Sequence, residues 1–85
     1  MELNGKILQI FEVKQISEKF SIQDFLIETT GEYPKKVLIQ AMKTAQPHIQ
    51  RMGVGATGTF KIDVESKEFN GKFYTNIKCF AVQEA

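Results

Sequence analysis

The sequence predicts an all-β domain that contains one short helix, and three observations carry this prediction. Apolar and polar residues alternate over most of the chain, which is the period of strands with one buried face. The period changes only near Pro47, where Ile49 and Met52 lie three residues apart, as on one face of a helix. Asn70-Gly71 joins two long alternating runs and is the strongest short-range hairpin signal, because a type I′ turn needs positive φ at both residues.

Length and composition favour one globular domain that is not embedded in a membrane. The 85 residues suffice for one core, so residues 1–85 are expected to form a single domain. Hydrophobic residues make up 42% and charged residues 25%, which is far from a disordered composition. The longest apolar run, residues 37–39, is too short to span a bilayer, and the N-terminus has no signal-peptide pattern. The single Cys79 cannot form an internal disulfide, so a cytoplasmic location is expected.

The elements follow in order from turn residues and alternation. The first strand has apolar residues at both parities, including Leu8 and Ile10, which predicts a bulge or bend. Gly53 is a cap after the last helical turn, and Pro34 lacks a backbone donor and marks a turn. The predicted elements are a strand at 2–14, a connection at 15–19, a strand at 20–30, a turn at 31–34, a strand at 35–42, a helix at 45–52, a connection at 53–55, and a hairpin from Ala56 to Gln83.

This order, three strands, a helix and two strands, matches the five-stranded Greek-key barrel called the OB-fold. A closed barrel removes exposed edges and lets a small chain bury a core, with the helix covering one open end. An SH3-like barrel is the rival, but it usually lacks a helix at this point. The expected core includes three aromatic rings and the inner face of the hairpin: Phe11, Phe25, Phe60, Ile62, Val64, Ile77, Cys79 and Ala81.

No constellation of catalytic or metal-binding residues is visible. His48 is the only histidine and Cys79 the only cysteine, which excludes histidine-pair metal motifs and zinc ribbons. Gly53, Gly55 and Gly58 match the spacing of a dinucleotide-binding motif, but they precede a strand instead of joining a strand to a helix. The sequence therefore predicts a protein that is not an enzyme and that has no cofactor and no metal.

The remaining chemistry is base stacking combined with phosphate contact. OB-folds bind oligonucleotides on the face of strands 2 and 3, between the loops that join strands 1–2 and 4–5. Aromatic rings stack on bases, and lysines follow the phosphates. Three segments carrying such residues are expected to converge: the first loop, the start of the third strand and the hairpin tip. The candidate nucleic-acid-binding residues are Lys19, Tyr33, Lys35, Lys36, Phe69, Lys72, Phe73, Tyr74, Lys78 and Phe80.

Each of these residue types also has a purely structural interpretation. Phe69 and Phe73 can equally pack in the core, because seven Phe and no Trp must fill a small barrel. Lys35 and Lys36 can form a solvated edge that discourages pairing with another sheet. Net charge does not decide between these interpretations: it is only +1, although residues 31–53 are locally basic.

Three segments resemble a family of small bacterial and phage-encoded proteins. They are Gly5-Lys6-Ile7, Tyr33-Pro34-Lys35-Lys36-Val37, and the run from Asp63 to Lys78 that contains the hairpin turn. The family was long described as a domain of unknown function and is now treated as an OB-fold, single-stranded-DNA-binding-like family. The resemblance covers nearly the whole chain and implies an OB-fold with single-stranded DNA as ligand. Family members often carry Trp where this chain has Phe73 and Phe80, so a smaller stacking surface is expected here.

Two functions follow as hypotheses. The first is a non-enzymatic protein that binds single-stranded nucleic acid, DNA rather than RNA, with little sequence preference. The second is a protein-interaction or oligomerisation module, and homo-oligomers are compatible with both. An apolar outward face on the second and third strands favours the second hypothesis. This face consists of Ile22, Leu26, Leu38 and Met42.

Overall fold

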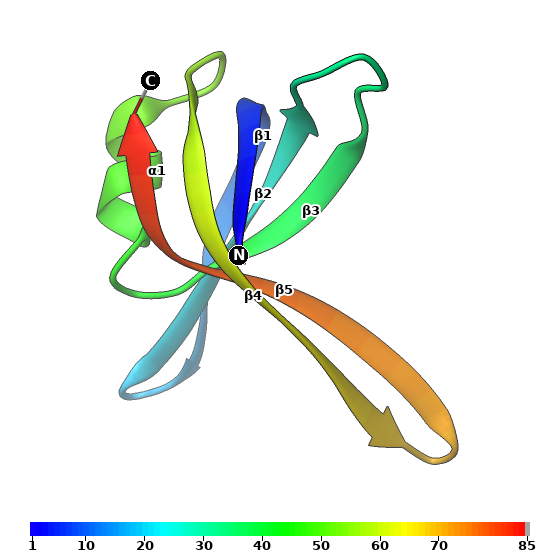
Figure 1. Ribbon diagram of the computed structural model, residues 1–85. Helices are drawn as coiled ribbons and strands as arrows, with labels where there is room; N and C mark the ends of the chain where they lie inside the picture. The colour runs from blue at the N-terminus through cyan, green and yellow to red at the C-terminus, as the bar shows by residue number, and fades with distance from the viewer. Residues whose placement is uncertain (85) are drawn as a thin grey trace.

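The computed structural model describes residues 1–84, which form five strands and one helix (Figure 1). The strands close into a barrel in the order β1-β2-β3-β5-β4. β3 and β5 pair in parallel, and all other neighbours are antiparallel. This confirms the predicted sequence of elements and is compatible with the OB-fold. The elements are β1 (Glu2–Ser17), β2 (Phe20–Thr29), β3 (Lys36–Ala41), α1 (Gln46–Met52), β4 (Thr57–Phe69) and β5 (Lys72–Glu84).

The core lies inside the barrel and is built from alternate residues of every strand. Phe25 and Phe60 are fully buried, as predicted, and their ring centroids are 5.5 Å apart with the planes tilted. The prediction that Phe11 is a core residue is wrong, because its side chain is 40% exposed. β1 shifts register against β2 between Ile7 and Gln9, so Ile10 lies opposite Phe25 and packs against the core, and Phe11 faces outward. This register shift is the bulge that the mixed parity of the strand predicts.

The helix α1 covers one end of the barrel and begins and ends close to the prediction. Pro47 occupies the first turn, where its missing N–H costs nothing, and Gly53 ends the helix with φ of 76°. Ile49 is fully buried, and Met52 packs against the core. Gln46 is also buried, and its amide nitrogen lies 3.2 Å from the Ser21 and Ala41 carbonyl oxygens. The helix is thus attached to the barrel by polar as well as apolar contacts.

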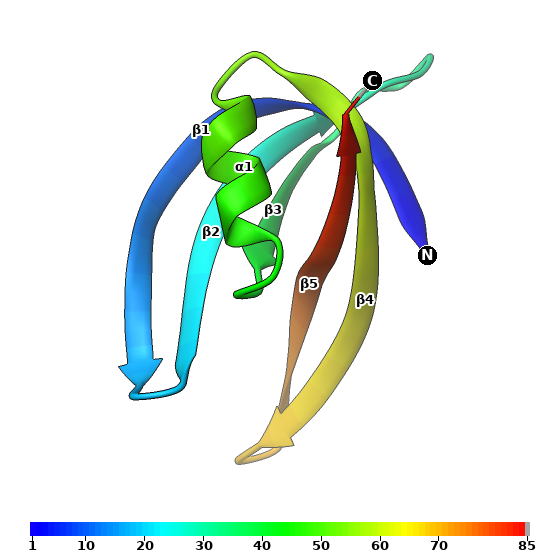
Figure 2. The ribbon, with the colours of Figure 1, turned by 90° about the vertical axis from the view of Figure 1, so that its left-hand side faces the viewer.

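Two hairpins extend beyond the barrel from the same end of the molecule (Figures 1 and 2). We call them the β1–β2 arm (residues 11–22) and the β4–β5 arm (residues 63–77). The predicted connection at 15–19 is wrong, because β1 continues to Ser17 and only Glu18 and Lys19 form the turn. Val64, predicted to line the barrel, is 43% exposed, because the β4–β5 arm has already left the core at this residue.

Strand β5 contains a bulge at Phe80 that changes which side chains face the core. Lys61 pairs with Ala81 and Ile62 with Cys79, so Phe80 has no partner on β4. Cys79 is buried as predicted, but the next inward residue is Val82, not Ala81. One extra residue in a strand shifts the alternation by one position.

Candidate nucleic-acid interface

The β4–β5 arm is a regular antiparallel ribbon that ends in the predicted turn. Asn70 has φ of 53° and Gly71 φ of 76°, as a type I′ turn requires. From Ile62 to Phe69 every residue of β4 has a partner on β5, without a register shift. Residues that are directly opposite in such a ribbon share a face, so the register assigns each aromatic ring to one side.

The aromatic residues of the arm divide between its two faces. Phe69 lies opposite Lys72, and Tyr74 lies opposite Lys67, so these four side chains share the face that points outward from the barrel. Phe73 lies opposite Glu68 on the other face, which continues the core side of the sheet. All three rings are well exposed: 66% for Phe69, 52% for Tyr74 and 70% for Phe73. None of them packs in the core, which removes the core interpretation of Phe69 and Phe73.

The outward face of the arm continues onto the barrel along β5. Lys78 and Phe80 have the same parity as Tyr74 and point outward, with Phe80 49% exposed at the bulge. Lys78 lies beside Gln40 of β3, so the outward sides of β5 and β3 form one surface. We call the outward side of residues 67–80 the β5 face.

Glu65 forms ion pairs with two lysines of this face, Lys67 and Lys78. Its carboxylate accepts a hydrogen bond from Lys78 Nζ at 2.6 Å and lies 3.7 Å from Lys67 Nζ. The hydrogen bond and charge of Lys78 lower the pKa of Glu65 below its ordinary value, with a smaller contribution from Lys67. Lys72, at the turn, has no such partner among the residues the structure describes.

The other predicted residues do not join this group. Tyr33 and Lys35 lie in the β2–β3 loop, at the end of the molecule opposite to the two arms (Figures 1 and 2). Lys36 begins β3 beside Glu28, next to that loop, and Lys19 lies at the turn of the other arm. The expected convergence of the three segments is therefore wrong. In a run of antiparallel strands, successive connections lie at opposite ends of the sheet. The β2–β3 loop therefore lies at the opposite end from the β1–β2 turn.

Sequence reasoning missed Lys67 and the acidic residues of the neighbouring strands. Lys67 shares the parity of Phe69, so extending the alternation of β4 by two residues would have found it. On the outward side of β2, Asp24 lies opposite Gln40 and Glu28 opposite Lys36. One carboxylate oxygen of Asp24 is buried and has no hydrogen-bond partner.

Three of the four side chains of the predicted apolar face of β2 and β3 are half-buried, not exposed. Leu26 lies directly opposite Leu38, and Leu38 is 53% exposed. The other three side chains of this face, Ile22, Leu26 and Met42, are half-buried. Leu38 is thus the one large exposed apolar residue that remains from this set.

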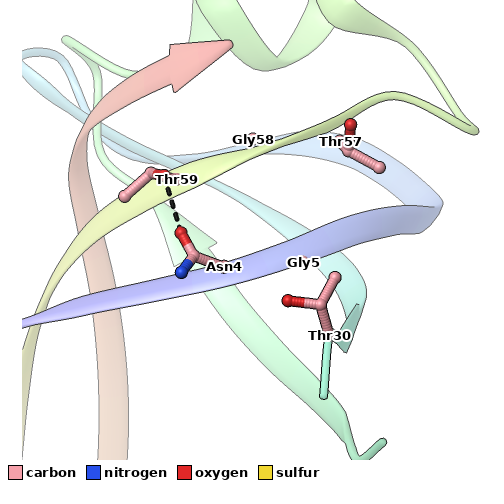
Figure 3. Close-up of a pocket in the computed structure, with 6 residues that line it drawn as sticks. All are labelled: Asn4, Gly5, Thr30, Thr57, Gly58 and Thr59. Carbon is pink, nitrogen blue, oxygen red and sulfur yellow. Dashed lines mark hydrogen bonds between the residues drawn. The ribbon is translucent and has the colours of Figure 1, made fainter. Parts of the chain in front are cut away.

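A pocket of about 320 Å³ lies near the start of β1 and β4 (Figure 3). Thr59 donates a hydrogen bond to Asn4 across it, with the oxygens 2.7 Å apart. Gly5 and Gly58 let the strands approach closely here, because a Cβ on Gly58 would lie 2.8 Å from the Gln83 carbonyl oxygen. The lining holds no charged side chain: it consists of Asn4, Gly5, Thr30, Thr57, Gly58 and Thr59.

Residues 1–84 contain neither a cluster of metal-ligating side chains nor a helix long enough to span a membrane. Within residues 1–84, no three His, Cys, Asp or Glu side chains form a cluster suited to a metal ion. The single helix in this range, α1, has seven residues and cannot cross a membrane. Burial raises the pKa of the Cys79 thiol to about 11, so the thiolate is scarce at neutral pH.

A comparison with protein-family models places the chain. Residues 2–83 match the family described as Domain of unknown function (DUF3127). The chain belongs to this family. A search of curated proteins found no match. The matched residues include both arms, the helix and every strand except for the last residue of β5, and the family description names no ligand or activity.

Proposed function

We propose that this DUF3127 member is a non-enzymatic OB-fold protein that binds single-stranded DNA on the β5 face, with little sequence preference. One observation carries the proposal: Phe69, Tyr74 and Phe80 are exposed on one outward surface that also bears lysines. Every base has a π-face, so stacking on such rings is worth about 1–3 kcal/mol per base whatever the sequence. Rings that fill no core and stand beside cations suit this use.

The charges of the two sides of the barrel suggest the path of the strand. Asp24 and Glu28 lie on the outward side of β2 and would repel phosphates. On the outward side of the β4–β5 ladder, lysines outnumber carboxylates: Lys67, Lys72 and Lys78 stand beside Glu65 and Asp63, which lies opposite Lys78. We expect the phosphates to follow the β4–β5 arm and the bases to lie on its rings.

DNA, the OB-fold and a cytoplasmic location belong to the same proposal. The barrel order, with β3 parallel to β5, supports the OB-fold assignment. The resemblance of the Tyr33–Val37 and Asp63–Lys78 segments to single-stranded-DNA-binding-like proteins favours DNA over RNA. A free thiol at Cys79 is suited to a reducing compartment.

A titration of a fluorescent oligothymidine, followed by anisotropy at low and moderate salt, tests the proposal. Binding is expected at low salt and should weaken as salt rises, with log K falling by about 0.7 per log unit of salt for each phosphate neutralised. Absence of binding at low salt would refute the proposal. So would an affinity that is indifferent to salt.

The two faces of the arm provide a matched control. The double variant Phe69→Ala/Tyr74→Ala should weaken binding by at least about tenfold, because two stacking contacts of about 1–3 kcal/mol each are lost. Phe73→Ala removes a ring of similar exposure from the opposite face and should leave the affinity unchanged. Equal losses in both variants would show that the β5 face is not the binding surface.

A protein-interaction module remains the second candidate, because Leu38 is 53% exposed beside Leu26. It predicts no anisotropy change with any oligonucleotide. It also predicts that Leu38→Lys abolishes a complex that forms without nucleic acid.

A further inference from the structure

The β4–β5 arm has an open strand edge. β4 pairs with β1 only from Thr57 to Lys61, and the Ile62 N–H then donates to the Met1 carbonyl. From Asp63 to Phe69, β4 has β5 on one side, and no other strand of residues 1–84 lies on its other side. Backbone groups of successive residues point to opposite sides of a strand, so those of Val64, Ser66 and Glu68, which share the parity of Ile62, are unpaired at this edge. They are a template for a further strand.

This edge has none of the backbone features that usually protect a strand from pairing. Residues 63–69 contain no Pro, no Gly and no bulge, and their register with β5 is uninterrupted. The one lysine of the edge, Lys67, is partly neutralised by Glu65 at 3.7 Å. By contrast, the open edge of β1 is broken by three register shifts. The β4 edge is the regular one of the two.

We propose that the β4 edge pairs with the β4 edge of a second copy of this chain, antiparallel, about a two-fold axis at Ser66. This register places Glu65 of each copy opposite Lys67 of the other, and Ser66 opposite Ser66. Opposite charges across a strand pair stabilise it, and like charges destabilise it. The result is a four-stranded sheet, β5-β4-β4-β5, with an isologous interface.

The charge pattern selects this register over its neighbours. A two-fold at Glu65 or at Lys67 would place a charge opposite its own copy. Directly opposite residues of an antiparallel pair share a face, so the two-fold must lie at a residue and not between two residues. A two-fold at Val64 would oppose Asp63 to Glu65, and one at Glu68 would oppose that carboxylate to its own copy. Only the two-fold at Ser66 opposes no like charges within two residues of shift, so the sequence of the edge is complementary to itself in one alignment.

The apolar groups of the arm fit the same arrangement. Val64 and Phe73 lie on the face opposite to the β5 face and are 43% and 70% exposed. In the paired state Val64 of each copy lies opposite Glu68 of the other, and Glu68 lies opposite Phe73, so these side chains form one row on one face of the four-stranded sheet. The β5 faces of both copies lie on its other side and stay accessible. The pairing therefore leaves the aromatic rings of the β5 face open to nucleic acid, while Lys67 belongs to both surfaces.

Sedimentation velocity over a concentration series of the full chain tests the pairing. Wild-type protein should be a dimer, and Lys67→Glu and Glu65→Lys should each weaken it by at least about tenfold, because two cross-strand attractions become repulsions. An equimolar mixture of the two variants should dimerise again, because Glu65 and the introduced Glu of one chain then face Lys67 and the introduced Lys of the other. Lys72→Glu makes the same charge change off the edge and should leave the dimer intact.

Disulfide trapping checks the register directly. Ser66→Cys should oxidise to a covalent dimer, because residue 66 faces itself across the two-fold. Glu68→Cys should not, because Glu68 lies opposite Val64 in this alignment. The native Cys79 is fully buried and does not compete. A wild-type protein that is monomeric at all concentrations overturns the proposal, and so does a mixture of the charge variants that fails to associate.

Discussion

The two arms differ in how they are attached to the barrel, although each carries four exposed large apolar side chains. The β1–β2 arm is irregular and tied to α1: Ser21 bonds to Gln46, and the adjoining Gln23 bonds to Gln50. The β4–β5 arm is regular, and beyond Ile62 only its own ladder holds it. Two arms with the same number of exposed apolar side chains can therefore differ in how they are attached to the barrel. One arm is fastened to the helix by hydrogen bonds, and the other is held by its own ladder alone.

The largest expected effect comes from cutting the attachment of the β1–β2 arm. Gln46→Ala leaves the Ser21 and Ala41 carbonyl oxygens unpaired in a buried site. The free energy of unfolding should fall by about 2–3 kcal/mol, measured by chemical denaturation, because buried polar groups without partners are costly. Hydrogen exchange should accelerate in this arm and not in the β4–β5 arm. Gln50→Ala, which loses one bond to Gln23, should cost about 1 kcal/mol or less and serves as the control.

A smaller effect is expected at the turn of the free arm. Gly71 has φ of 76°, so Gly71→Ala introduces strain of about 1 kcal/mol. This strain should speed hydrogen exchange at the tip of the β4–β5 arm and leave the barrel protected. Asn70→Gly keeps the positive φ and should change exchange only slightly. Uniform acceleration over the whole barrel would show that the arm is not independent.

The smallest effect concerns the pH dependence of the same arm. Lys78 lowers the pKa of Glu65 below its ordinary value of 4.5, so the unfolded chain binds this proton more readily than the folded one. The contribution to stability is therefore complete above about pH 4.5 and is lost as the pH falls through the folded pKa. An NMR titration should place the Glu65 midpoint below 4.5, and Lys78→Met should move it upward. An unchanged midpoint in this variant would contradict the assigned cause.

The order of elements and the hairpin turn could be predicted from the sequence because both depend on local chemistry. Pro47, Gly53 and Asn70-Gly71 each favour one backbone conformation, and all of them occupy the expected element. The buried position of Cys79 followed from simple alternation. These features need no knowledge of distant contacts.

The errors share a cause that alternation does not reveal. Phe11 and Val82 exchange faces with their neighbours because bulges add a residue to β1 and β5. The mixed parity of β1 indicates a bulge but not its position, and the alternation of β5 gives no sign of one. Val64 is exposed because β4 continues past the barrel with the same alternation. The separation of Tyr33 from the arm tips depends on chain direction, which only the topology supplies.

The bulge at Phe80 is a suitable position for a fluorescent probe of the proposed binding surface. Phe80 lacks a partner on β4 and is 49% exposed, so a larger ring can replace it without disturbing the ladder. The chain has two Tyr and no Trp, and Phe80→Trp would therefore introduce a single Trp on the β5 face that can be excited selectively over tyrosine. Its emission would report ligand arrival at that surface without any label on the oligonucleotide.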